Sequence, residues 1–166
     1  MAKNKNWEEK MKDSKDLPKV VKLDPKGVKQ WGGETMVVPA PLEVDEIMRS
    51  VPEGKLVTIN EIRQKLAKKH HTDIGCPLTS GIFAWIVANA AEEMRETLNA
   101  QGKKGEISDK DITPWWRTLK TGGFLNEKFP SGPDMQKKML EGEGHKVAQK
   151  GKKWQVEDYE SKVVKV

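Results

Sequence analysis

The side chains best suited to chemistry in the middle of the chain are His70, His71, Asp73 and the single cysteine, Cys76. Imidazole, carboxylate and thiolate groups bind zinc, and a thiolate is also a nucleophile. The two histidines are adjacent at the expected end of a helix, so one ion cannot easily reach both rings. Cys76 has no flanking residue that clearly activates a thiol. We therefore expect no metal, no cofactor and no enzymatic role here, although an enzyme acting through Cys76 stays an alternative.

A second candidate site is the segment Pro114-Trp115-Trp116-Arg117. An indole has one N–H donor and a flat face but no nucleophile, and stacking of a base on such a face contributes about 1–3 kcal/mol. We expect residues 114–120 to form a strand, which would direct the two indoles to opposite faces. One indole could then line a pocket, although simple packing of both stays open. Arg117 could bind a phosphate or anchor a carboxylate.

Several polar and basic residues could contact a phosphate backbone. Thr79, Ser80 and Gly81 come just before a long apolar pattern, and hydroxyls and backbone N–H groups at the start of a helix suit a phosphate. Ordinary helix capping is the alternative. Four lysines should flank the same cleft, either as phosphate ligands or as solvated surface charges: Lys120, Lys128, Lys137 and Lys138.

Hydrophobic periodicity and turn residues predict the elements that must position these side chains. Thr58 and Glu61 have the spacing of a capping box, which marks a helix start. The expected elements are, in order, a strand at 34–38, helices at 42–51, 58–71 and 80–98, a strand pair at 114–120 and 124–126, a helix at 131–142 and a hairpin at 145–156. The third helix should be the spine of the core, because a broad apolar stripe runs along it: Ile82, Phe83, Ile86, Val87, Ala90, Ala91, Met94 and Leu98.

Length and composition limit the class of protein. The chain has 166 residues, 36% of them hydrophobic, and a net charge of +5, with lysines concentrated near both ends. One cysteine excludes an internal disulfide framework. We find no run of about 18 apolar residues for a membrane span and no apolar core of a secretory signal. We therefore expect a cytoplasmic protein that has no contact with a membrane.

The fold expected from this order is mostly α with short β elements, an α+β fold. Three helices followed by short strands are the order of a winged helix-turn-helix, in which the third helix would read DNA and the segment 115–126 would be the wing-like element. We predict a basic, largely flexible tail at 1–30, a winged-helix DNA-binding domain at 31–147 and a C-terminal hairpin or tail at 148–166.

Three segments resemble the alkylguanine-DNA alkyltransferases (methylated-DNA–protein cysteine methyltransferases). Residues Pro52–Ile62 are similar to the segment that opens the DNA-binding half of that family, with its proline, glycine, lysine, threonine, glutamate and isoleucine. Pro114–Arg117 stands where the family carries Pro-Cys-His-Arg. Ser131-Gly132 and Gln136–His145 resemble its C-terminal active-site loop and helix. The resemblance covers roughly residues 42–147 and implies the C-terminal fold of these DNA alkyltransferases.

The departures from the family pattern concern its chemistry. Trp115 stands at the position of the alkyl-accepting cysteine and Trp116 at that of the histidine, so Glu143 would have no histidine to orient. Ile59 replaces the tyrosine that rotates the phosphate, and Leu78 lies near the position of the arginine finger. The chain also has extra residues around 70–78 and 95–112.

Tryptophan in place of the acceptor cysteine resembles the alkyltransferase-like proteins, which bind DNA with an alkylated guanine flipped into the pocket and pass the lesion to other repair factors. The resemblance implies a non-catalytic protein in DNA repair whose partners are duplex DNA, alkylated guanine and a further repair protein. The implied DNA-binding residues are Thr58, Thr79, Ser80, Gly81, Arg117 and Lys120. The implied lesion pocket consists of Pro114, Trp115, Trp116, Ser131, Gly132 and Glu143. The alternative is a protein-interaction module that kept the fold and lost DNA binding.

Overall fold

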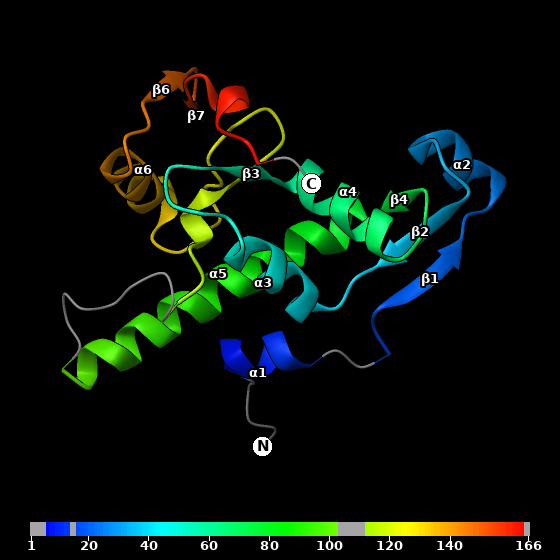
Figure 1. Cartoon of the computed structure of the whole chain (residues 1–166), viewed down its shortest axis with the longest axis horizontal. Helices are drawn as coiled ribbons and strands as arrows, with labels where there is room; N and C mark the ends of the chain where they lie inside the picture. The colour runs from blue at the N-terminus through cyan, green and yellow to red at the C-terminus, as the bar shows by residue number, and fades with distance from the viewer. Residues whose placement is uncertain (1–5, 14–15, 103–111, 165–166) are drawn as a thin grey trace.

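A computed structural model describes residues 6–13, 16–102 and 112–164 (Figure 1). Its helices and strands are, in chain order, α1 (Trp7–Lys12), β1 (Lys19–Lys22), α2 (Pro25–Trp31), β2 (Thr35–Val38), α3 (Pro41–Arg49), β3 (Val57–Thr58), α4 (Ile59–Lys69), β4 (Ile74–Gly75), α5 (Pro77–Ala100), the 3-10 turn η1 (Trp115–Arg117), β5 (Thr118–Leu119), α6 (Gly132–Gly142), β6 (Val147–Lys150), β7 (Lys153–Val156) and the 3-10 turn η2 (Tyr159–Ser161). Long helices with short strands confirm the α+β class.

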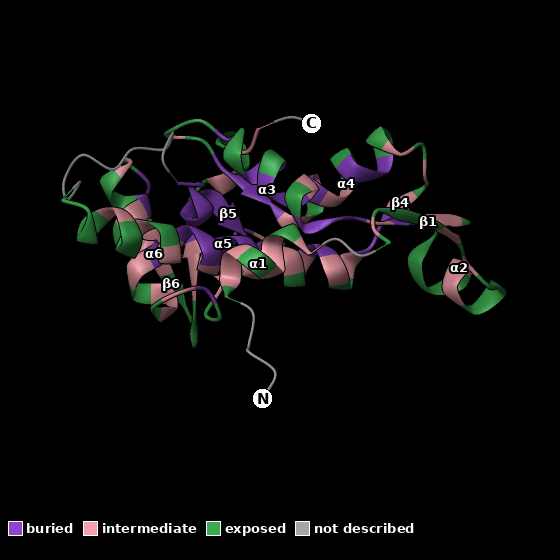
Figure 2. Ribbon diagram, turned by 90° about the horizontal axis from the view of Figure 1, so that it is seen from below, coloured by how far each residue is buried: buried purple, intermediate pink, exposed green. Residues whose placement is uncertain are grey.

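Helix α5 is the spine of the core, as predicted. Helices α1, α3 and α4 pack along it, and the buried residues of the molecule surround it (Figures 1 and 2). The predicted apolar stripe was too broad, however. The face that packs inward consists of small side chains, among them Ala84, Val87, Ala88 and Ala91, whereas Ile82 is 44% exposed. Small residues let the neighbouring helices approach closely, which leaves the bulkier flank of α5 outside the core.

Two helix starts differ from the prediction. Helix α5 begins at Pro77, in the expected loop, because proline already has the backbone angle of a first helical residue and Cys76 serves as the N-cap. Thr58 does precede α4, but its hydroxyl donates to the carboxylate of Glu61 instead of accepting from a backbone N–H. Thr58 also ends β3, whose parallel pairing with β5 constrains its backbone.

The range 1–30, which the sequence predicts to be a largely flexible tail, contains helices and a strand where the structure describes it. Strand β1 pairs antiparallel with β2, which pairs in parallel with β4. The backbone N–H groups of Trp7 and Glu8, at the start of α1, donate to the carboxylate of Glu93 on α5. The Val20–Val21 pair supplies a strand despite the flanking lysines, because a paired edge strand needs few buried side chains. Residues 1–5, 14 and 15, and most of the predicted loop at 99–110, lie outside the described residues.

The predicted strand at 114–120 is wrong in its first half. Trp115–Arg117 form a 3-10 turn, and only Thr118 and Leu119 continue as a strand. The two indoles therefore do not alternate between faces. Both are buried, with ring centroids 6.0 Å apart in an edge-to-face arrangement.

The C-terminal elements agree with the prediction. Helix α6 follows Ser131, and β6 pairs with β7 around a turn at Lys150–Lys153, which confirms the predicted hairpin. The division into three regions stays a prediction, as does the winged-helix arrangement.

Gly75 provides a test of the packing between β4 and α4. A Cβ at this position would lie 2.5 Å from the backbone oxygen of Arg63, which cannot move away as a flexible side chain could. We expect Gly75→Ala to lower the free energy of unfolding by about 1–3 kcal/mol, the usual cost of overpacking, in urea titrations.

Gly81 is the matched control, because it lies inside helix α5 with nothing within 4 Å of an added Cβ. Gly81→Ala should leave stability unchanged or raise it, since alanine favours the helix. Equal stability of the Gly75→Ala variant and the wild type would contradict the close approach.

Candidate nucleic-acid interface

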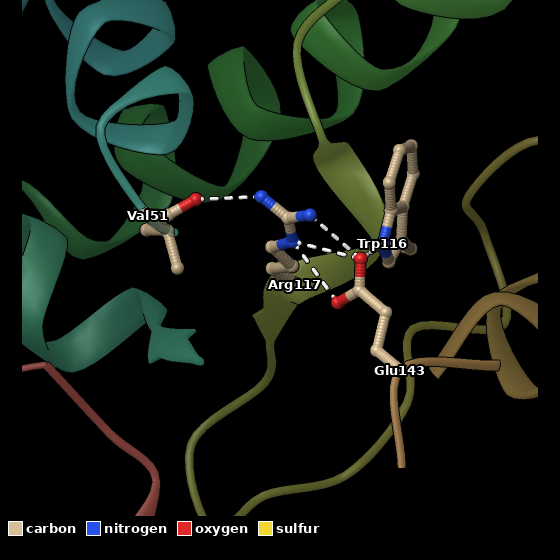
Figure 3. Close-up of polar contacts among 4 residues, drawn as sticks. All are labelled: Val51, Trp116, Arg117 and Glu143. Atoms are coloured by element: carbon tan, nitrogen blue, oxygen red, sulfur yellow. Dashed lines mark hydrogen bonds and ion pairs between the residues drawn. The ribbon is translucent and has the colours of Figure 1, made fainter. Parts of the chain in front are cut away.

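A buried ion pair joins the last residue of η1 to the C-cap of α6 (Figure 3). Arg117 is 1% exposed, and its Nη2 donates to Oε2 of Glu143 at 2.6 Å while Nε donates to Oε1 at 3.0 Å. Its Nη1 donates to the carbonyl oxygen of Val51 at 2.8 Å. Trp116 Nε1 donates to the same carboxylate at 3.0 Å. Glu143 thus binds an indole and a guanidinium, which corrects the expectation that it orients nothing.

Trp115 is fully buried and forms its own contacts. Its Nε1 donates to Oε1 of Glu92 on α5 at 2.8 Å, and Arg95 Nε donates to the same oxygen at 3.0 Å. The ring of Phe129 meets that of Trp115 edge to face, 5.7 Å between centroids. Between the two readings left open by the sequence, the structure therefore favours packing for both indoles.

The predicted lesion-pocket residues come together in part. Pro114, Trp115 and Trp116 are all buried, and Glu143 contacts Trp116. Ser131 and Gly132 stand at the start of α6, where both have left-handed backbone angles, φ 62° and 71°. The burial of both indoles means that neither presents an open face to a base.

A groove of about 640 Å³ lies beside the first turns of α5. Its apolar part comes from α5, where Leu78 is 71% exposed and Trp85 is 36% exposed. Lys120 and Lys128 also line it. The complete lining is Ile59, Pro77, Leu78, Gly81, Ile82, Trp85, Lys120, Thr121, Asn126 and Lys128. We call this the α5 groove.

Several hydrogen bonds fix the walls of the α5 groove. Trp85 Nε1 donates to the carbonyl oxygen of Lys128 at 3.0 Å. The fully buried Gln136 accepts from the backbone N–H of Asn126 at 2.9 Å and donates from Nε2 to the carbonyls of Trp116 and Thr118. One buried amide therefore ties the η1 turn to Asn126, which lines the groove.

The predicted DNA-binding residues divide into two groups. Gly81 and Lys120 line the α5 groove. Thr58, Ser80 and Arg117 are buried, and the buried hydroxyl oxygens of Thr79 and Ser80 have no hydrogen-bond partner among the described residues. Arg117 anchors Glu143 instead of facing solvent. Direct contact of DNA with each predicted residue stays a prediction.

The sequence did not identify the apolar wall of the groove. Ile82 was expected in the core, Leu78 was noted only as a departure from the family, and Trp85 was not singled out. One signal was available: apolar residues occupy more of the circumference of α5 than one buried face can cover.

Charge on the rim of the α5 groove is mixed. Lys120 Nζ lies 3.5 Å from Oε1 of Glu127. A backbone hydrogen bond, together with the charges of Lys120 and Lys153, holds the pKa of Glu127 below its ordinary value. Glu127 is therefore ionised at neutral pH, while Lys128 is exposed beside it.

Comparison with known proteins gives a remote structural likeness. No family model and no curated protein matches the sequence. The chain is similar to a crystal structure of S. pombe Atl1 in complex with damaged DNA containing O6-carboxymethylguanine, with 20% identity, a TM-score of 0.47, and 76% of this chain and 94% of that chain covered. It is also similar to a structure of S. pombe ATL in complex with DNA, with 18% identity, a TM-score of 0.45 and the same coverage.

Two further features of the described residues concern membranes and metals. Within the part of the chain that the structure describes, no helix is both long and apolar enough to cross a membrane. In the same residues, no three His, Cys, Asp or Glu side chains converge as a metal site would require. His70 instead lies 2.6 Å from the carboxylate of Glu43.

Removing the charge of Glu143 tests the buried ion pair. Glu143→Gln would leave the guanidinium of Arg117 buried without a counter-charge, so we expect the free energy of unfolding to fall by about 3–5 kcal/mol. Glu141→Gln, at an exposed position two residues earlier on α6, is the matched control and should change stability little. Urea titrations in which both variants unfold alike would contradict the role of the pair.

His145 predicts a pH dependence of stability. The ring is 7% exposed, and burial lowers its pKa below 6.5, with the charges of Lys162 and Arg117 acting in the same direction and Glu143 opposing them. On acidification, His145 therefore takes up a proton more readily in the unfolded chain than in the folded chain. The free energy of unfolding should fall as the pH drops below the pKa of this histidine in the unfolded chain.

The measurement is the unfolding free energy of the wild type and of His145→Gln at about pH 7.5 and about pH 5.5, on either side of an ordinary histidine pKa. We expect the wild type to lose more stability on acidification than the variant, because only the wild type carries this linked proton. An identical loss in both proteins would exclude His145 as its source.

Proposed function

We propose that this protein binds duplex DNA without catalysis, and that alkylated guanine is the lesion it recognises. The observation that carries the proposal is the α5 groove, whose lining combines exposed apolar side chains of a helix with two lysines. Phosphates bind to lysines, whereas bases and sugars offer flat, weakly polar faces to apolar side chains. The groove offers both kinds of surface side by side.

The walls of the groove support this proposal. Gly81 leaves the backbone of α5 open to close approach, because nothing lies within 4 Å of a Cβ built there. Leu78 projects at the first turn of the helix with 71% of its surface exposed. Apolar side chains of this kind act as wedges between base steps in several classes of DNA-binding protein.

The absence of catalysis is proposed from the residues at the acceptor position. Trp115 has no nucleophilic atom, and its N–H is bound to Glu92. Cys76, the single thiol of the chain, is buried at the N-cap of α5. Burial is typical of a structural cysteine, whereas reactive cysteines are partly exposed.

A second candidate is a protein-interaction module. It is favoured by the exposed apolar side chains of Leu78 and Ile82 and by the pairing of Lys120 with Glu127, which reduces the positive charge on the rim. Such a module would bind its partner with little dependence on salt, whereas phosphate contacts release counter-ions and weaken steeply with salt.

Fluorescence anisotropy with a plain duplex and an O6-alkylguanine duplex at two salt concentrations tests the proposal. We expect binding that weakens as salt rises, and a preference of tenfold or more for the alkylated duplex, equivalent to about 1.4 kcal/mol. Replacing both lysines of the groove, Lys120→Gln with Lys128→Gln, should weaken binding to both duplexes and reduce the salt slope by about 2.

The matched control is a double variant that carries both Lys26→Gln and Lys29→Gln. Both lysines are exposed on α2, at the far end of the molecule from α6 (Figure 1). This control should bind like the wild type. Equal affinity for both duplexes would remove the lesion from the proposal, and no binding at low salt would overturn DNA binding itself.

A further inference from the structure

The β6–β7 hairpin is a strongly basic element that the proposed site leaves unused. Residues 144–156 contain Lys146, Lys150, Lys152 and Lys153 and no acidic residue. All four lysines are exposed, and none forms an ion pair with another described residue. Like charges this close repel one another, so their concentration on one short hairpin indicates a binding role for anions more than a contribution to folding.

The hairpin is fixed to the wall of the α5 groove by backbone hydrogen bonds. The N–H of Leu125 donates to the carbonyl of Trp154 at 2.9 Å, and the N–H of Val156 donates to that of Gly123 at 3.0 Å. Gln155 Nε2 donates to the carbonyl of Gly122 at 2.7 Å. Segment 122–125 directly follows groove residues Lys120 and Thr121, and neighbouring strands lie about 4.8 Å apart. The hairpin lysines therefore have a fixed position relative to the groove.

A second depression, of about 240 Å³, is lined by residues of the hairpin together with residues of the chain that follows the groove segment: Leu125, Glu127, Pro133, Lys152, Lys153 and Trp154. Glu127 interacts electrostatically with Lys120 of the groove and with Lys153 of the hairpin. Lys137 Nζ of α6 lies 4.2 Å from the centre of the Trp154 ring.

We propose that the β6–β7 hairpin is a second phosphate-binding element, whose lysines contact the backbone of the same duplex beyond the part held in the α5 groove. This inference rests on the proposed function, and it extends the DNA footprint from a single groove to a groove and a flanking basic hairpin. A duplex is the occupant we favour, because its phosphates repeat along a rigid rod and can reach both surfaces at once. An anionic membrane fits less well, since Val156 is buried and Trp154 is half-buried beneath Lys137, which leaves little apolar surface for insertion.

The test uses a double variant of the full chain that carries both Lys152→Gln and Lys153→Gln. Its binding is compared with that of the wild type on plain duplexes of one and of two helical turns. We expect the double variant to lose affinity on the two-turn duplex and to lower the slope of log K against log salt by about 2, one for each phosphate contact. On the one-turn duplex, which the groove alone can cover, the loss should be smaller. The Lys26→Gln with Lys29→Gln control should keep the wild-type slope on both lengths.

Three outcomes would overturn the inference. If the hairpin variant binds the two-turn duplex with the affinity and salt slope of the wild type, the inference is overturned while binding in the groove is left intact. Binding of the wild type to phosphatidylserine vesicles that is lost in the hairpin variant, with DNA binding unchanged, would assign the lysines to a membrane. Failure of the wild type to bind either duplex would overturn the proposed function as well, so the two failures are distinguishable.

Discussion

The ion pair between Arg117 and Glu143 is the interaction on which the rest of the arrangement depends. It joins three parts of the chain in the interior, because Arg117 also binds the carbonyl of Val51 after α3, and Glu143 also binds the indole of Trp116. Burying these charges is costly, and the cost is offset only when each donor and acceptor is matched, as it is here. Helix α6 is thereby held against the η1 turn. Gln136 of the same helix then fixes the segment that forms the groove wall.

The two indoles extend this network. They stand at positions 115 and 116, where the family that the sequence resembles carries a cysteine and a histidine. Each indole N–H meets a separate carboxylate, Glu92 or Glu143, so that neither of these two buried donors is left unsatisfied. The interior is well packed, and the accessible hollow lies outside it, beside α5.

Part of the fold could be read from the sequence, because its signals are local. Glycine, proline and serine around residues 131–133 and 142–151 mark α6 and the hairpin, and both formed as predicted. Other features depend on contacts distant in sequence. The 3-10 turn at Trp115 is set by its packing against Phe129 and Glu92, and strand β1 exists because β2 offers it an edge. The groove was missed because periodicity cannot tell which flank of a broad apolar stripe is covered.

The central claim, that the α5 groove is the surface that meets DNA, is tested most directly by titrating the isotopically labelled full chain with duplex and following backbone amide shifts by NMR. The account predicts that the largest shifts fall on Gly81, Thr121 and Asn126, which line the groove, whereas Val21 in β1 stays unchanged. Shifts confined to β1 and β2, or a spectrum that saturating duplex leaves unaltered, would contradict it.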